Sequence, residues 1–270
     1  IDAPARHDPP MLSLENTYNE ADLRELLERR GVIVFPQINF SDEEQIAFTR
    51  TMGRFLTEME GQEVYNITLD KSLNQKSEYL KGSLYWHADG TMNKVPIGAA
   101  ILSSKVLPTW GGNTEFCNTY AAYDALPEQD KKQIEGLAAM HSAWTSLFYY
   151  EPEPSYAKLE EMIRIGEVEL PLVWKHRSGR KSLVLGSTAS HIEGMDLRKG
   201  WALLTRLRAW ATRPSMNATF STPACTASRS RASPSMSSCR AISTSAARPG
   251  CSGRISTRGR PRAWRAPTST

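Results

Sequence analysis

Cysteines, long apolar runs and, toward the C-terminal end, acidic residues are scarce in this sequence. Of the four cysteines in 270 residues, only Cys117 precedes residue 214. A single cysteine in the main body argues against a disulfide framework and favours a reducing compartment. No apolar run reaches the roughly 20 residues that cross a bilayer, and no basic start precedes an apolar stretch. We therefore expect a cytoplasmic protein without a membrane segment or signal peptide.

Charge is distributed unevenly along the chain. Nine arginines and no acidic residue lie beyond residue 213, so the net charge of +4 hides two unlike parts. Residues 1–213 hold 24 basic and 29 acidic residues, a net charge of −5. This main body is therefore an ordinary acidic domain and not a basic nucleic-acid binder.

The last part of the chain, residues 214–270, contains no Leu, Val, Asp, Glu, Lys, Gln, His or Tyr. A stretch that is mostly Ser, Arg, Ala, Thr and Pro buries too little apolar surface to fold, which predicts disorder. Three explanations are open: a basic tail that binds nucleic acid, a natural linker, and a shifted reading frame in GC-rich DNA. We favour the frameshift, because codons for Ser235–Cys239 can spell Asp-Val-Val-Met in a neighbouring frame.

Apolar patterning predicts one domain over residues 19–213, after a loose Pro-rich segment at residues 1–18. Capping residues and helical periodicity predict helices at 19–31, 41–53, 118–137 with a break at Pro127, and 197–212. Apolar or alternating runs predict strands at 32–35, 63–69, 97–102, 140–144, 169–175 and 182–186. Many strands with few, grouped helices favour a mainly β fold with flanking helices (α+β), built on a jelly-roll (double-stranded β-helix, cupin-like) core whose C-terminal part is incomplete.

The most informative stretch is Tyr85–Met92, which reads Tyr-Trp-His-Ala-Asp-Gly-Thr-Met. Side chains two residues apart on an extended segment point to the same side, so His87 and Asp89 can hold one metal ion. An imidazole and a carboxylate supply two corners of a 2-His-1-carboxylate iron site, which leaves positions open for a co-substrate and oxygen. A His–Asp hydrogen bond at a strand end uses the same two residues, so the pair alone leaves both interpretations open.

Further motifs follow in a fixed order. A Gly-Gly-x-Thr turn ends at Thr114, and a Tyr-x-Ala-Tyr-x-Ala-Leu motif spans Tyr120–Leu126. The later segments in the same register are Leu170–Val173, Ser178–Leu183 and Ile192–Met195. Together with Trp-His-x-Asp, these motifs resemble the taurine dioxygenase family of iron(II)/2-oxoglutarate oxygenases, over roughly residues 20–213.

The resemblance implies an enzyme that uses Fe²⁺, 2-oxoglutarate and O₂ to hydroxylate a small organic substrate, with succinate and CO₂ as co-products. It implies that His87 and Asp89 are the iron ligands. Thr114 would help to hold the carboxylate of 2-oxoglutarate, and a threonine that caps the following helix is the alternative. The residues that flank the motif and become candidates for the substrate pocket are Tyr65, Asn66, Tyr85, Trp86 and Met92. The substrate itself stays open among sulfonates, sulfate esters, aryloxyalkanoates and amino-acid derivatives, as does a homo-oligomer.

The family also requires a second metal histidine and, about ten residues later, an arginine that pairs with the distal carboxylate of 2-oxoglutarate. No residue here matches either one, since the last histidine, His191, lies too early. His141 and His176 sit in strand-like runs and are expected to be hydrogen-bonded structural residues. Two hypotheses result: an oxygenase in its intact form, and a catalytically dead scaffold or binding protein of the same fold. A nucleic-acid-associated protein that acts through its basic tail is a third.

Overall fold

The computed structural model describes residues 20–35, 38–57, 62–74, 77–105, 114–220, 239–243 and 255–256, with only the backbone from residue 217 onward. Most of the predicted tail, the Gly-Gly turn before Thr114 and the predicted loose segment at residues 1–18 lie outside this range. Within the range, no helix combines the length and the apolar character that crossing a membrane would need.

The described part of the chain begins with a helix–strand–helix unit made of α1 (Glu20–Arg30), β1 (Ile33–Val34) and α2 (Asp42–Met52), as the capping residues predicted. Ser41 starts α2 with a capping box: its hydroxyl accepts from the Glu44 amide, and the Glu44 carboxylate accepts from the Ser41 amide. The apolar faces of the unit meet in one buried cluster, formed by Leu23, Ile33, Phe35, Phe40, Phe48 and Met52.

The segment between α2 and residue 105 holds only one described element of three residues or more, the 3-10 helix η1 (Tyr79–Leu84). The predicted strands at 63–69 and 97–102 are therefore wrong. Ile67 is 42% exposed, so the alternating pattern around it does not mark a face buried on a sheet. In the second stretch, the Ile101 carbonyl accepts from the Gln45 side chain at 3.1 Å, which occupies a group that a strand partner would use.

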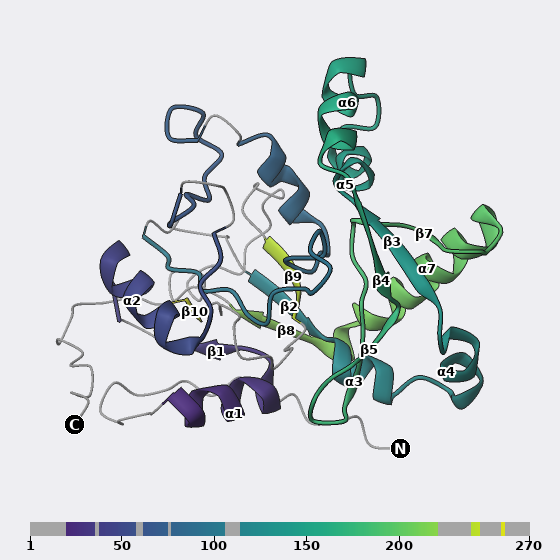
Figure 1. Cartoon of the computed structure of the whole chain (residues 1–270), viewed down its shortest axis with the longest axis horizontal. Coiled ribbons are helices and arrows are strands. Elements are labelled where there is room, and N and C mark those ends of the chain that lie inside the picture. Colours follow the sequence, from purple (N-terminus) through teal and green to yellow (C-terminus); the bar gives the residue numbers. More distant parts are fainter. Residues whose placement is uncertain are drawn as a thin grey trace, which may run out of the picture.

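The described strands form four small sheets (Figure 1). One has β2 (Thr114–Asn118) between antiparallel β8 (Asn217–Phe220) and parallel β9 (Cys239–Ser243). Another has β3 (Ala138–Ser142) between two antiparallel partners, β4 (Glu167–Pro171) and β7 (Ala189–Ile192). The two-stranded sheets are the hairpin of β5 (Val173–Lys175) with β6 (Lys181–Leu183), and β1 with parallel β10 (Ile255–Ser256).

Helices cover the second of these sheets. The helices after β2 are α3 (Thr119–Asp124), α4 (Glu128–Ile134), α5 (Ala143–Tyr150), α6 (Tyr156–Arg164) and α7 (Leu197–Ala211), followed by the 3-10 helix η2 (Pro214–Met216). Figure 1 shows α7 lying along β7 and β3, with α5 and α6 at one end of that sheet. Pro127 caps α4, so the predicted break at that residue is confirmed. The largest core cluster joins α7, through Leu203, Leu204 and Leu207, to Ala88, Leu183 and Ile192.

Two expectations about the fold are revised. More of the described residues lie in α-helices than in strands, whereas the sequence favoured a mainly β fold. The helices α5 and α6 were not predicted, and the start of α5 falls in the segment 140–144 that was predicted to be a strand. The jelly-roll core itself stays a prediction. Ordered structure also continues past residue 213, since Met216 is buried and β8, β9 and β10 are strands. These strands need only backbone groups from β2 and β1 as partners, so a poor apolar composition does not preclude them.

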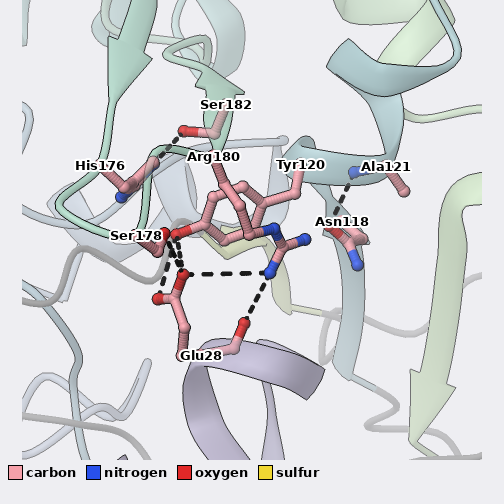
Figure 2. Close-up of polar contacts among 8 residues, drawn as sticks. All are labelled: Glu28, Asn118, Tyr120, Ala121, His176, Ser178, Arg180 and Ser182. Carbon is pink, nitrogen blue, oxygen red and sulfur yellow. Dashed lines mark hydrogen bonds and ion pairs between the residues drawn. The ribbon is translucent and has the colours of Figure 1, made fainter. Parts of the chain in front are cut away.

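A polar cluster fastens α1 to the β5–β6 hairpin (Figure 2). The Glu28 carboxylate accepts from the Tyr120 hydroxyl at 3.2 Å and from the Ser178 hydroxyl at 2.9 Å. Arg180 donates to the Glu28 carbonyl at 2.8 Å, and its guanidinium stacks 3.7 Å above the centre of the Tyr120 ring. We call these four residues the Glu28 clamp. It joins segments that are about 150 residues apart in sequence.

Candidate metal centre

His87 lies where the chain leaves η1 and enters a short extended stretch. Its Nδ1 is 2.8 Å from the Tyr85 carbonyl oxygen. A carbonyl only accepts, so Nδ1 carries the proton and Nε2 keeps its lone pair. That Nε2 lies 3.3 Å from Oδ1 of Asp89. The backbone thus orients the imidazole so that Nε2 faces the carboxylate, as the i, i+2 spacing predicted.

The separation of the two groups fits a shared ion. Neighbouring ligands of an octahedral ion, each at about 2.1 Å from it, lie about 3 Å apart. The observed 3.3 Å matches this distance, and the side chains of His87 and Asp89 are 16% and 24% exposed, so an ion can reach them. The donor set, one imidazole nitrogen and one carboxylate oxygen, also suits a divalent transition metal.

Two glycines shape the chain around this pair: Gly90 lies within residues 87–91, which we call the His-Asp turn, and Gly186 packs against that turn. A Cβ on Gly90, which has φ +74°, would lie 2.7 Å from the Ile97 nitrogen. A Cβ on Gly186, with φ +146°, would lie 3.1 Å from Cα of His87. Only glycine permits both the conformation and the close approach at these positions. The Ser187 amide donates to the Trp86 carbonyl at 2.9 Å, which fixes the two segments together.

A third ligand is not found near this pair. Among the described residues, no group of three His, Cys, Asp or Glu side chains is arranged to hold a metal ion. His191 instead lies on β7, 2.9 Å from the Ser190 hydroxyl and 3.8 Å from Glu193. The described part of the chain therefore offers two candidate ligands, His87 and Asp89, and no third one beside them.

The two histidines expected to be structural are both buried and hydrogen-bonded, which confirms that interpretation. His176 Nε2 lies 2.7 Å from the Ser182 hydroxyl, and His141 Nδ1 lies 2.9 Å from the Thr188 hydroxyl. Burial lowers the pKa of His141 to about 4, and it also lowers the pKa of His176. Both imidazoles are thus neutral at ordinary pH.

The remaining predicted site residues have varied surroundings. Thr114 starts β2 and is half-buried, and Asn118 rather than Thr114 caps the following helix α3 through the Ala121 amide. Trp86 packs against the main core cluster, so its side chain contributes to the core. Asn66 is exposed, and its carbonyl accepts from the Asn74 side chain.

Tyr65 and Met92, the outer candidates for the pocket, are both half-buried. The Tyr65 hydroxyl is a buried atom without a hydrogen-bond partner among the described residues. A buried hydroxyl of this kind is available to a ligand.

Three residues form a cationic aromatic group that sequence reasoning mostly missed. The Tyr85 and Tyr149 rings are in contact, with centroids 5.3 Å apart. Arg208 of α7 donates to the Tyr149 hydroxyl and, at 3.4 Å, to the Gly186 carbonyl. No carboxylate with a described side chain forms an ion pair with Arg208, so its half-buried charge is not neutralised there. Tyr149 and Arg208 sit in ordinary helices, which offer no motif to mark them.

Comparisons with known proteins identify the family. The family model "Taurine catabolism dioxygenase TauD, TfdA family" matches residues 6–222. This chain belongs to that family. The predicted relationship is confirmed, and the match is longer at both ends than the predicted span of roughly 20–213.

Several relatives of this TauD/TfdA family chain carry informative names. An alpha-ketoglutarate-dependent 2,4-dichlorophenoxyacetate dioxygenase of Burkholderia sp. (strain RASC) is 33% identical over 225 residues, 75% of each protein. An (S)-phenoxypropionate/alpha-ketoglutarate-dioxygenase of Sphingobium herbicidovorans is 36% identical over 204 residues, 72% of this chain and 70% of the relative. The solved structure of AAD-2 in complex with Mn(II) and N-oxalylglycine matches with a TM-score of 0.61 and 26% identity, over 79% of this chain and 77% of that one. The chain is thus related to alpha-ketoglutarate-dependent dioxygenases in both sequence and fold.

Proposed function

We propose that this protein is an Fe²⁺- and 2-oxoglutarate-dependent dioxygenase that hydroxylates a small organic acid of the aryloxyalkanoate type. The observation that carries the proposal is the facing pair of His87 Nε2 and Asp89 Oδ1, 3.3 Å apart, in a chain of the TauD/TfdA family. A His–Asp hydrogen bond would need the same approach, so metal binding decides between the two interpretations.

When bound, iron and 2-oxoglutarate supply the oxidation of a substrate C–H bond by O₂, with succinate and CO₂ as co-products. His87 and Asp89 hold the metal, and the Tyr85 carbonyl keeps the His87 imidazole in the tautomer that can bind it. Thr114 is the proposed contact for a carboxylate of 2-oxoglutarate. The solved structure of a relative with Mn(II) and N-oxalylglycine supports the use of a metal together with 2-oxoglutarate, because N-oxalylglycine has the same carboxylate spacing as 2-oxoglutarate.

The substrate class rests on the cationic aromatic group and on the relatives. An aryloxyalkanoate presents an aromatic ring and a carboxylate, and both need partners in a binding site. Tyr85 and Tyr149 offer aromatic faces next to the His-Asp turn, and Arg208 offers a guanidinium without a described carboxylate partner. Two relatives at 33% and 36% identity are named for phenoxyacetate and phenoxypropionate substrates.

Metal binding is the first test. Titration of the protein with Mn²⁺, followed by the electron paramagnetic resonance signal of the free ion, should give a dissociation constant in the micromolar range or below. His87→Ala should abolish this binding, whereas His191→Ala, which removes a histidine outside the site, should leave it unchanged. Equal binding by wild type and His87→Ala would exclude the proposed centre.

Turnover is the second test. Succinate formation should be measured with Fe²⁺, 2-oxoglutarate and a panel of a phenoxyacetate, a sulfonate and a sulfate ester. We expect succinate formation to rise when the phenoxyacetate is added. Arg208→Ala should raise KM for that acid more than it lowers kcat. The same assay should be repeated on a chain translated in the frame that restores the missing histidine and arginine. Succinate formed only by that restored chain would show that the present chain is incomplete, whereas no succinate from either chain would contradict the proposal.

A second candidate, an inactive protein that keeps the scaffold, has one observation in its favour. The described residues provide only two candidate metal ligands, and the family match ends at residue 222, nine residues into the tail that starts at residue 214. Tight Mn²⁺ binding combined with no succinate from any substrate, in both the present chain and the restored one, would favour this candidate.

A further inference from the structure

A row of hydrogen bonds runs from the core of the β3 sheet to the His-Asp turn. His141 Nδ1 lies 2.9 Å from Oγ1 of Thr188, and that oxygen lies 2.9 Å from Oγ1 of Thr91. Thr91 in turn donates to the carbonyl of Ala88 at 3.4 Å. His141 and Thr91 are almost completely buried, at 0% and 2% exposure. The row therefore joins a buried histidine to the residue that lies between the two proposed metal ligands.

The direction of each hydrogen bond in the row follows from its last acceptor. The Ala88 carbonyl can only accept, so the single hydroxyl proton of Thr91 points to it. The Thr188 hydroxyl must then donate to Thr91, and its oxygen must receive a proton from His141. His141 consequently carries its proton on Nδ1, which leaves Nε2 as a bare lone pair. This agrees with the surroundings, since His141 Nε2 is a buried atom without a hydrogen-bond partner among the described residues.

We propose that His141 and Thr188 are positioning residues for the metal centre, which fix the Ala88 peptide and thereby the angle between the His87 and Asp89 side chains. The inference rests on the proposed function, because it assigns a role toward the metal that the two ligands would hold. Neither residue touches the ion. They act through Thr91.

The surroundings of Ala88 explain why its peptide has to be held from this side. Gly186 leaves no room on one side, because a Cβ on it would lie 3.1 Å from Cα of His87 and 3.2 Å from the Ala88 nitrogen. The turn at Gly90 follows directly after Asp89, so a rotation of the Ala88 peptide would swing the Asp89 carboxylate away from His87 Nε2. The Thr91 hydroxyl opposes that rotation by holding the carbonyl oxygen.

Burial supports the same assignment of protons. Because desolvation lowers the pKa of His141 to about 4, the imidazole stays neutral at ordinary pH and has one proton to donate. Because neutral His141 has one described hydrogen-bond partner, its single N–H group always donates to the Thr188 hydroxyl. A charged one would hold a proton on both nitrogens and would bury an unpaired N–H group.

The experiment compares Mn²⁺ affinity in near-isosteric variants of the whole chain. Thr188→Val removes the hydroxyl that links the row, and it should weaken Mn²⁺ binding by about 10- to 100-fold, the usual effect of losing a residue that supports a metal ligand. His141→Asn places an N–H group at the position of Nδ1 and should bind Mn²⁺ better than His141→Leu, which cannot donate. An equal loss in the Asn and Leu variants would contradict the donor role.

Thr145→Val is the matched control. Thr145 is a buried threonine whose hydroxyl lies 2.7 Å from that of Ser142, in a hydroxyl pair that does not reach Ala88. Its loss should lower the urea midpoint of unfolding as Thr188→Val does, while the Mn²⁺ affinity stays at the wild-type value. If both valine variants changed Mn²⁺ affinity alike, the effect would be one of general stability, and the inference would be overturned.

A second readout does not depend on metal. Long-range ¹H–¹⁵N correlation spectra of histidine rings report which nitrogen is protonated, and they should show His141 as the Nδ1–H tautomer in wild type. Detection of the Nε2–H tautomer would contradict the proposed directions of the hydrogen bonds and would overturn the inference. The outcomes also separate the two proposals: no Mn²⁺ binding by wild type removes the proposed function and the inference together, whereas wild-type binding that Thr188→Val does not weaken removes the inference alone.

Discussion

Replacement of His141 by Asn should remove a pH-dependent loss of stability. The pKa of His141 is about 4 in the folded protein, against about 6.5 for an exposed histidine in the unfolded chain. As the pH falls below 6.5, His141 binds a proton in the unfolded chain but not in the folded protein. The free energy of unfolding therefore decreases between pH 6.5 and pH 4. Above pH 6.5 neither state binds the proton, and the histidine has no effect on stability.

The size of this effect follows from the same two pKa values. Between pH 7.5 and pH 5, the unfolded state gains about 2 kcal/mol from protonation of this one histidine, while the folded state gains almost nothing. The full difference, reached below pH 4, is about 3 kcal/mol. An asparagine does not titrate, so the stability of the variant relative to wild type should rise by about 2 kcal/mol on going from pH 7.5 to pH 5.

Urea unfolding followed by tryptophan fluorescence at pH 7.5, 6 and 5 measures this difference, because the carboxylates titrate alike in both proteins and cancel. His191→Asn serves as the control, since its side chain is 35% exposed on β7 and should follow the wild-type curve. A gap between wild type and His141→Asn that stays constant across the three pH values would refute the reasoning, because it would mean that His141 is not desolvated in the folded state.

Three further predictions concern other parts of the molecule. Gly186→Ala should weaken Mn²⁺ binding and cost about 1–3 kcal/mol of stability, because its Cβ would press on His87; Gly179→Ala, where a Cβ meets nothing within 4 Å, should leave Mn²⁺ titrations unchanged. Glu28→Ala should lower the free energy of unfolding, measured in urea, by about 1–3 kcal/mol, since it leaves the hydroxyls of the Glu28 clamp without their acceptor. Cys117, with 1% exposure and a pKa raised to about 12 by burial, should resist iodoacetamide at pH 8 until the protein is denatured, as mass spectrometry of its peptide would show.

Local signals predicted local structure well in this chain. The capping box at Ser41, the proline before α4 and the apolar stripe of α7 each act within a few residues, and the corresponding helices form where expected. The strands predicted at 63–69, from alternation, and at 97–102, from a continuous apolar run, are wrong because either pattern forms a strand only when a partner edge exists. The Ile101 carbonyl bonds a glutamine side chain instead. Partner edges depend on distant segments, which a local pattern does not reveal.

The approach of the two proposed ligands was predictable from the sequence, but the residues that support them were not. His87 and Asp89 are two residues apart, so their approach follows from backbone geometry alone. Thr188 and His141 reach the same turn from about 50 to 100 residues away, and each looks in sequence like an ordinary strand or loop residue. Arg208 likewise has no sequence motif that marks it, because it lies in an ordinary amphipathic helix. Long-range contacts of this kind become visible only once the fold brings the segments together.

The arrangement of β2 has a consequence for how the protein is made. Both neighbours of this strand come from later in the chain, β8 from residues 217–220 and β9 from residues 239–243. During synthesis, the amides and carbonyls on both edges of the strand that begins at Thr114 therefore stay unpaired until more than 100 further residues have left the ribosome. Chains cut short before residue 217 would keep both rows open permanently. Such chains should be captured by chaperones or associate with one another through this strand.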